Sequence, residues 1–312
     1  MSVMIESFNL TKKFNNLRAV EDLSIQVNKG EILGFLGPNG AGKTTTIRML
    51  VGIIAPTKGY AVVAGIRTDK EVERLHEVIG LLTETPGFYE RLTARENLLY
   101  FVRFYDIDPD SQVDKYIQRM GLWERRNDKV VIFSKGMKQR LALARALVHE
   151  PEVLFLDEPT AGLDPKSAKE VRELIMKLKE GGRTIFLSTH NLEEAELLCD
   201  RIAVFRTRLV VIDTPHNLRN SLFQRQVIVE LETVNEKVIN AVKSLDFVLD
   251  VKRNGKQLTI ELRDFDKSRP ELVKCIVENN GKIQSVLEKK HSLEEIYLTL
   301  IKEEEGMKRE RR

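Results

Sequence analysis

The sequence feature that most constrains the fold is the glycine-rich stretch GPNGAGKT at residues 37–44. It follows the apolar run EILGFL and precedes a segment with helical character, the strand–loop–helix setting in which the pattern G-x-x-x-x-G-K-[ST] binds phosphate. Glycines let the backbone wrap closely, so that successive N–H groups point at an anion. The pattern indicates a nucleoside triphosphate site in which Lys43 reaches the β- and γ-phosphates and the Thr44 hydroxyl binds Mg²⁺.

A second candidate site is the apolar run VLFL at residues 153–156, which ends in Asp157 and Glu158. Acids often terminate buried strands, so this pattern gains weight only beside a phosphate loop that needs a magnesium carboxylate. We expect Asp157 to hold Mg²⁺, directly or through water. Glu158 is expected to polarise the water that attacks the γ-phosphate, a role worth roughly 10²–10⁴-fold in rate.

The stretch FSKGM at residues 133–137 precedes the helical-looking KQRLALARAL. A helix start has unpaired N–H groups and a positive dipole end, so it favours an anion. The loop at residues 37–44 already supplies such an end, and the sequence therefore contains a second anion-seeking helix start.

The composition describes a globular chain of 312 residues, long enough for one large domain or two ordinary ones. Lys and Arg number 50 against 47 for Asp and Glu, which gives no support to nucleic-acid binding by bulk charge. Cys199 and Cys275 lie far apart without CxxC spacing, which suits a reducing compartment and argues against a disulfide scaffold or a zinc site. No apolar run approaches the roughly 18 residues that a membrane-spanning helix needs. We expect a cytoplasmic chain whose membrane role comes through a partner.

Apolar strands alternate with amphipathic helices over the first 220 residues, which predicts an α/β fold with a parallel sheet covered on both faces. The capping box Thr93–Glu96 opens a helical subdomain expected at about residues 91–150. Asp164 is predicted as a helix N-cap before Pro165. The predicted strands are 3–10, 22–27, 31–36, 153–156, 184–188 and 202–205, and the other helices are 43–52, one after Pro165, and 192–199.

A second domain is predicted at residues 224–303, because the pattern beyond Pro215 reads β-α-β-β-α-β, the ferredoxin-like order. Asn254-Gly255 is a typical hairpin turn between two of its strands. Regulation, stabilisation of a dimer and ligand sensing are the open hypotheses for this accessory α+β domain. The predicted strands are 225–233, 247–253, 257–263 and 282–288, the helices are 235–245, 268–280 and 292–303, and residues 304–312 form a flexible tail.

Taken in order, the motifs over about residues 3–220 resemble the ATPase subunit of an ATP-binding-cassette (ABC) transporter. FSKGM resembles that family's signature LSGGQ, residues 161–164 resemble its D-loop, and residues 188–190 end in its switch histidine, here His190. Phe14 falls where an aromatic ring usually stacks on adenine. Several motifs in the expected order are far more specific than any one of them, and the resemblance predicts the P-loop NTPase fold of an ABC ATPase core.

The resemblance implies that ATP with Mg²⁺ is bound and hydrolysed, with Glu158, His190 and Lys43 as the catalytic residues. Glu84 stands where the family normally carries Gln; it either faces Mg²⁺ or water, or is a solvated loop acid. In the signature, Lys135 replaces a glycine and Met137 a glutamine, whereas Ser134 and Gly136 are retained. The implied nucleotide-binding residues are Phe14, Gly37, Pro38, Asn39, Gly40, Ala41, Gly42, Lys43, Thr44, Thr45, Glu84, Ser134, Gly136 and Asp157, of which Thr44, Asp157 and Glu84 are the implied Mg²⁺ ligands.

The resemblance also implies a head-to-tail dimer in which each phosphate loop is closed by the signature helix of a second copy or of a related cassette. Within the family, TETPGFYERLTARENLLYF and SLEEIYLTLI resemble bacterial drug and antibiotic exporters with a separate polytopic membrane permease. The chain would then lie on the inner face of the cell membrane through this partner, with residues 89–93 near the groove that receives a permease helix. No nucleic-acid partner is expected.

The competing hypothesis is a soluble ABC-type ATPase that acts in translation or DNA repair. Such proteins usually carry two cassettes in one chain, a long coiled coil or zinc insertions. This sequence has one cassette, no sustained heptads and no cysteine cluster, which favours the transporter subunit.

Overall fold

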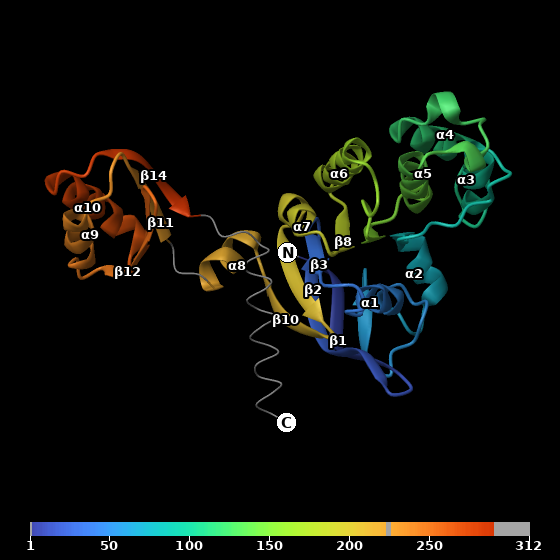
Figure 1. Cartoon of the computed structure of the whole chain (residues 1–312). Helices are drawn as coiled ribbons and strands as arrows, with labels where there is room; N and C mark the ends of the chain where they lie inside the picture. The colour runs from blue at the N-terminus through green and yellow to red at the C-terminus, as the bar shows by residue number, and fades with distance from the viewer. Residues whose placement is uncertain (1, 223–225, 290–312) are drawn as a thin grey trace. The chain divides into compact units, whose positions relative to one another are not determined.

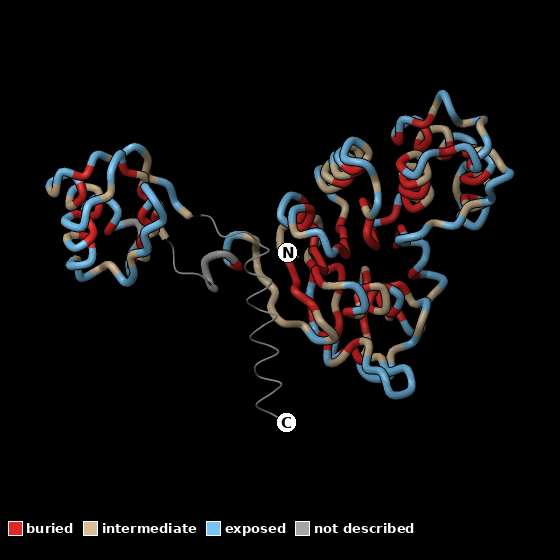
Figure 2. The backbone as a smooth tube through the Cα atoms, in the orientation of Figure 1, coloured by how far each residue is buried: buried red, intermediate tan, exposed pale blue. Residues whose placement is uncertain are grey.

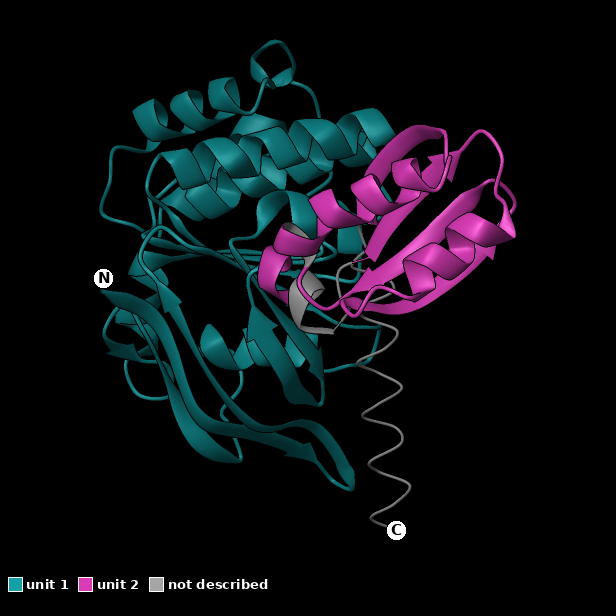
Figure 3. Cartoon of the chain, turned by 90° about the vertical axis from the view of Figure 1, so that its left-hand side faces the viewer, with its two compact units in different colours: residues 1–214 teal, residues 215–312 magenta. Residues whose placement is uncertain are grey.

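The computed structural model of this chain describes residues 2–222 and 226–289. The chain divides into two compact units, residues 1–214 and residues 215–312, which Figure 3 colours separately. Each unit is described by itself below. No helix among the described residues is both long enough and apolar enough to cross a membrane.

The first unit is built on a six-stranded sheet with the order β10-β9-β3-β8-β7-β6 (Figure 1). The five strands from β9 to β6 run parallel, and β10 pairs antiparallel with β9 at one edge. Every residue of the central strands β3, β7 and β8 is buried, which explains their nearly unbroken apolar sequences. The strands are β3 Ile32–Leu36, β6 Ile79–Leu82, β7 Val153–Asp157, β8 Thr184–Thr189, β9 Arg201–Arg206 and β10 Arg208–Asp213.

Four helices belong to this sheet: α1 (Lys43–Leu50), α2 (Val72–Val78), α6 (Pro165–Glu180) and α7 (Leu192–Leu198). The predicted N-cap of α6 is present, because Asp164 accepts hydrogen bonds from the amides of Lys166 and Ser167. The α/β core predicted from the sequence is confirmed. The short elements α2, β6 and β10 were not predicted.

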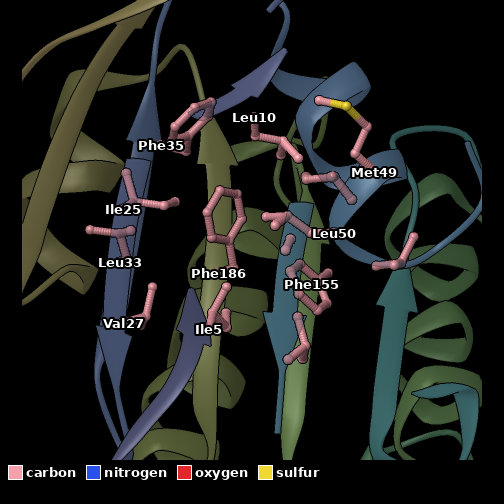
Figure 4. Packing of buried hydrophobic residues seen from close by; sticks show 14 of the residues in the cluster. Ile5, Leu10, Ile25, Val27, Leu33, Phe35, Met49, Leu50, Phe155 and Phe186 are labelled. Atoms are coloured by element: carbon pink, nitrogen blue, oxygen red, sulfur yellow. The ribbon is translucent and has the colours of Figure 1, made fainter. Parts of the chain in front are cut away.

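A second, four-stranded antiparallel sheet has the order β2-β1-β4-β5. Its buried side chains pack toward the parallel sheet, and α1 contributes Met49 and Leu50 to the same core (Figure 4). Figure 2 shows these buried positions as the red interior of the unit. The sequence indicated β1 and β2 as strands but not that they leave the parallel sheet and form their own. The strands are β1 Val3–Phe14, β2 Leu17–Asn28, β4 Lys58–Val63 and β5 Ile66–Arg67.

The predicted helical subdomain contains α3 (Ala94–Val102), α4 (Pro109–Arg119) and α5 (Lys135–Leu147), which gather together in Figure 1. Short 3₁₀ turns at Trp123–Arg125 and Val130–Ile132 connect α4 to α5. The capping box is present: the Thr93 hydroxyl accepts from the Glu96 amide at 3.1 Å, and the Glu96 carboxylate accepts from the Thr93 amide at 2.7 Å.

The second unit begins with α8 (Pro215–Leu222) and continues as β11, α9, β12, β13, α10 and β14. Its sheet order β12-β13-β11-β14 with antiparallel neighbours is the ferredoxin-like arrangement that the sequence predicted. Helix α10 begins three residues before the predicted start, because Asp264 caps it. The predicted helix 292–303 and tail 304–312 lie outside the described residues. The elements are β11 Gln226–Leu231, α9 Glu236–Lys243, β12 Val248–Asn254, β13 Gln257–Leu262, α10 Phe265–Glu278 and β14 Ile283–Lys289.

Candidate functional site

A cleft of about 420 Å³ lies at the N-terminal end of α1. It brings together the phosphate loop, the end of β1 and the acids Glu84 and Glu158, which are separated by up to 144 positions in the chain. The lining residues are Phe14, Leu17, Arg18, Ala19, Pro38, Asn39, Gly40, Gly42, Lys43, Thr44, Thr45, Glu84, Glu158 and Thr207.

The loop before α1 requires glycine at two points. Gly42 has a φ of +106°, and a β carbon there would lie 2.2 Å from the carbonyl oxygen of Ala19. At Gly37, a β carbon would lie 2.2 Å from the carbonyl oxygen of Phe205. No side chain among the described residues caps α1. The first amides of this helix therefore stay available for an anion, which is the arrangement that a phosphate cradle needs.

Lys43 is buried at the base of the cleft, with 6% of its side chain exposed. Its ammonium donates to the carbonyl oxygens of Gly37 at 2.8 Å and Pro38 at 3.3 Å. It also lies 3.1 Å from Oε1 of Glu158, whose side chain is 8% exposed. Burial of both charges demands such pairing, and a nucleotide phosphate entering this cleft offers the ammonium a second anionic partner.

Glu158 directly follows β7 and has the strained φ of +51°. Its Oε2 accepts from the His190 amide at 3.4 Å and lies 2.8 Å from Nδ1 of the His190 ring. The His190 side chain is half exposed, so it reaches the solvent side of this pair. Strain of this kind persists where the surrounding contacts over-determine the conformation, and it concentrates at reactive sites.

The two side chains predicted to hold Mg²⁺ lie beside this group. The Thr44 hydroxyl donates to Oδ2 of Asp157 at 2.8 Å, and the Ser188 hydroxyl donates to Oδ1 of the same carboxylate. A hydroxyl and a carboxylate are the hard oxygen ligands that Mg²⁺ prefers when it also binds phosphate. Both side chains fit the role predicted for them. Ser188 was not predicted, although its place at the end of a strand adjacent to β7 was a usable signal.

The structure places most of the predicted residues in or next to the cleft. Some of them support the cleft without lining it. Gly37 contributes the carbonyl that holds Lys43, and Ala41 is buried. Phe14 is 45% exposed and lines the mouth, as a ring that stacks on adenine must. The Glu84 side chain is exposed on the lining.

Ser134 and Gly136 do not line this cleft. They begin α5, where the Ser134 hydroxyl accepts from the Met137 amide at 3.2 Å. Gly136 packs on α6: a β carbon there would lie 2.5 Å from Oγ of Ser167. Within one chain the second anion-seeking helix start is therefore separate from the first site.

Four lining residues escaped the sequence analysis: Leu17, Arg18, Ala19 and Thr207. The first three follow the tight turn after Phe14, and the pairing of Phe14 with Leu17 across the β1–β2 hairpin places them at the same mouth. The Asn15-Asn16 pair was the available turn signal. Thr207 arrives from the β9–β10 turn, and nothing local indicated it.

Comparison with known proteins gives two family matches. Residues 20–161 match the ABC transporter family, and residues 214–301 match the C-terminal domain of DrrA1-3-like ATP-binding proteins. The bacitracin transport ATP-binding protein BcrA of Bacillus licheniformis is 38% identical over 303 residues, which cover 96% of this chain and 98% of that protein. The fluoroquinolones export ATP-binding protein of Mycobacterium tuberculosis (strain CDC 1551 / Oshkosh) is 41% identical over 213 residues, covering 68% and 70%.

Among solved structures, a dimeric ATP-binding cassette in a post-hydrolysis state with ADP and phosphate matches with a TM-score of 0.62. It is 25% identical, and the match covers 68% of this chain and 98% of that one. The two relatives compared by sequence are named for transport and export, which supports the transporter prediction. They give no support to the translation and DNA-repair alternative. With its phosphate cleft, its paired acids and a relative matched over nearly its whole length, the chain belongs to the ATP-binding, ATP-hydrolysing subunits of ABC transporters.

Proposed function

We propose that this chain powers export through a membrane permease, by hydrolysing ATP in the cleft at the start of α1. The proposal rests mainly on one observation: Glu158 contacts both Lys43, at 3.1 Å, and His190, at 2.8 Å. A cation, a general base and a hydrogen-bonding imidazole then surround the place where a γ-phosphate meets the attacking water. The relatives named for transport or export support a role in transport.

In this proposal each residue has one task. Lys43 leaves Glu158 for the phosphate oxygens, and the freed Glu158 carboxylate takes the proton of the attacking water. His190 forms a hydrogen bond with the γ-phosphate from the solvent-exposed side of the site. Thr44 and Asp157 would hold Mg²⁺, whose charge would offset that of the phosphates, and Glu84 on the lining of the cleft would face the ion or a water molecule.

The adenine is proposed to stack on Phe14, which has 45% of its surface exposed at the mouth of the cleft. Base–aromatic stacking contributes about 1–3 kcal/mol for each ring. Substitution of Phe14 by Ala is therefore expected to weaken nucleotide binding while leaving the chemistry unchanged.

The Glu158→Gln variant tests the catalytic assignment. It keeps the shape of the side chain but removes the base, so turnover should fall roughly 10²–10⁴-fold while ATP binding persists. Because the uncleaved nucleotide remains bound, this variant should accumulate as a dimer in size-exclusion chromatography. Unchanged turnover in Glu158→Gln would remove the proposed base.

We propose a homodimer or a pair with a related cassette, in which the start of α5 closes the other subunit's cleft. The support is that Ser134 and Gly136 lie outside the cleft of their own chain, and that a dimeric cassette is among the structural relatives. A two-fold axis allows the same two surfaces to complete both sites.

The permease is proposed to dock at a second cleft of about 590 Å³, between α2 and the helical subdomain. It presents apolar and aromatic surface that includes Ile53, Phe101 and Phe104, and Phe104 is 74% exposed. The predicted contact region at residues 89–93 is adjacent, since the Tyr89 ring lies 6.4 Å from that of Phe101. This docking would place the chain on the inner face of the cell membrane.

Co-purification from detergent-solubilised membranes tests this partner. The Phe104→Asp variant should lose the permease while keeping ATP hydrolysis, because Phe104 does not line the nucleotide cleft. Recovery with ribosomes or DNA instead of a polytopic protein would contradict the transport role. The ferredoxin-like unit is proposed as an accessory domain, and its removal at Pro215 should leave nucleotide binding intact.

A further inference from the structure

A buried carboxylic acid outside the proposed catalytic group lies in the first turn of α7. Glu194 is 1% exposed, although it is an acid on a short helix with two exposed glutamates nearby. A buried carboxyl group is unfavourable unless hydrogen bonds satisfy it. Its partners therefore indicate what this position is for.

Two hydroxyl groups satisfy the Glu194 carboxyl group. Thr160 donates to Oε1 at 2.6 Å, and Thr189 donates to Oε2 at 2.7 Å. Both donors are themselves buried. They come from different segments: Thr160 is the second residue after Glu158, whereas Thr189 directly precedes His190. One carboxyl group thus joins the two segments that carry the proposed base and the proposed switch histidine.

Thr189 is held on further sides. Its hydroxyl accepts from the Asn191 amide at 3.0 Å, and its carbonyl oxygen accepts from the Gly37 amide at 3.3 Å at the base of the phosphate loop. On the other side, Thr160 follows Pro159, whose carbonyl accepts from Gln139 of α5 at 2.7 Å. The Glu194 carboxyl group therefore links the phosphate loop side of the site to the side that contacts the signature helix.

Burial, hydrogen bonds and nearby charges all affect the pKa of the Glu194 carboxyl group. Burial raises its pKa, the hydroxyls of Thr160 and Thr189 lower it in part, and the nearby Glu158 raises it further. Arg172 of α6 is the cation whose field opposes this rise. Neither of these charged groups forms a hydrogen bond with Glu194 in the described part of the chain, so the two threonine hydroxyls are its side-chain anchors.

We infer that Glu194 is a positioning residue for ATP hydrolysis, which clamps the Thr160 and Thr189 segments so that Glu158 and His190 face each other at 2.8 Å. The inference rests on the catalytic roles proposed above for Glu158 and His190. Glu194 itself does not line the nucleotide cleft. Its loss should therefore slow the chemical step while the affinity for ATP is kept.

The Glu194→Ala and Glu194→Gln pair tests this inference. Removal of the carboxyl group releases both hydroxyls, so Glu194→Ala should lose roughly 10–100-fold in kcat, the effect typical of residues that orient reactive groups. Glutamine presents one acceptor and one donor to the same hydroxyls and should retain at least about half of wild-type kcat. The equilibrium Kd for ATP, measured by displacement of a fluorescent nucleotide without Mg²⁺, should change less than about twofold in both.

If Glu194 only stabilised the fold, its loss would change the unfolding temperature and leave kcat unchanged. Ser7→Ala is the matched control, since Ser7 is equally buried and bonded, to Leu23 and Ile25 in the antiparallel sheet. It should lower the unfolding temperature without changing kcat below that temperature. If Glu194→Ala behaves like Ser7→Ala, or if Glu194→Gln loses as much kcat as Glu194→Ala, the positioning role is wrong.

A second pair keeps the inference testable if Glu194→Ala does not fold. Thr189→Val removes the hydroxyl and should lower kcat, whereas Thr189→Ser retains it and should restore activity. Equal activity of these two variants would contradict the clamp. Glu158→Gln is measured in the same assay: if it still turns over, the proposed base has failed, whereas an inactive Glu158→Gln with fully active Glu194→Ala refutes only the clamp.

Discussion

The N-termini of α1 and α5 both attract anions, but their amides are satisfied in different ways. At α1, no described side chain caps the helix, Gly42 has a φ of +106°, and the first amides open into the nucleotide cleft. At α5, the hydroxyl of Ser134 already accepts from the Met137 amide. The first end is preformed for phosphate within its own chain. The second has its Met137 amide already paired within the single chain, and its Ser134 hydroxyl keeps its proton for a ligand.

This difference suits a site that assembles in two stages. In the proposed dimer, nucleotide would bind first to the open end of α1, and the capped end of α5 would engage only when another subunit presents a γ-phosphate. The Ser134 hydroxyl can donate its proton to a phosphate oxygen while its own oxygen still accepts from the Met137 amide. Under this proposal, ATP is the ligand that favours the closed dimer.

The largest effect is expected when the α1 end and the α5 end are disabled in different subunits of one dimer. Lys43→Ala disables the α1 end and Ser134→Arg disables the α5 end, so each homodimer should be inactive in a phosphate-release assay. Mixing the two variants should restore roughly a quarter of wild-type activity, because half of the dimers are mixed and each mixed dimer holds one complete site. No recovery above the separate variants would contradict closure across the dimer.

A smaller effect is expected from a change of the α1 end itself. Gly42→Ala forces a β carbon to within 2.2 Å of the Ala19 carbonyl at a positive φ. It should destabilise the fold by about 1–3 kcal/mol in denaturant titrations and abolish ATP binding. Gly65→Ala is the matched control, since Gly65 has a φ of +78° with open space around it and lies outside the cleft. Equal loss of ATP binding in both would show that backbone strain alone explains the result.

The N-cap of α5 can be removed by substitution of Ser134, and the effect on the free energy of unfolding can be measured without nucleotide. Ser134→Ala should lower the free energy of unfolding of unit 1 by about 1 kcal/mol, the usual contribution of a serine N-cap. Ser111→Ala, at an exposed position inside α4, should change it by less than about 0.5 kcal/mol. A Ser134→Ala variant as stable as the wild type would show that the α5 amides do not depend on this hydroxyl.

The smallest effect concerns the other end of α5, where His149 follows the helix. A helix C-terminus favours a cation, but burial lowers the pKa of His149 below its ordinary 6.5, with its Nε2 at 2.8 Å from the Ile79 carbonyl. The neutral ring is therefore favoured in the folded state. Its contribution to stability is present above pH 6.5 and is lost as the pH falls below that value.

Thermal unfolding between pH 7 and pH 5 checks this sign. The wild type should lose more stability over the interval than His149→Gln, which keeps a donor for Ile79 but does not titrate. A larger loss in His149→Gln would contradict the lowered pKa.

Much of the site was predictable because its motifs are local. Lys43 and Thr44 follow the glycine loop directly. Asp157 and Glu158 follow four consecutive apolar residues, which are typical of a buried strand. The ferredoxin-like order of the second unit was predictable for the same reason, since period-two and period-3.6 patterns alternate clearly there. By contrast, the separate antiparallel sheet was missed, because β1 pairs with β4, which is distant in the chain, and such a pairing leaves no local pattern. β10 was missed although it pairs with its neighbour β9.

By itself, the sequence determined the phosphate loop, the paired acids, the helix caps and the alternation of strands and helices, since each depends on neighbours within a few residues. Only the tertiary structure decided that Lys43, Glu158 and His190 meet, and that Glu194 holds the segments around them. The physical reason is the register of the parallel sheet. Asp157 pairs with Ser188 at the adjoining ends of β7 and β8, and β3 ends beside Thr189, so residues 37–43, 157–160 and 188–190 converge on one edge.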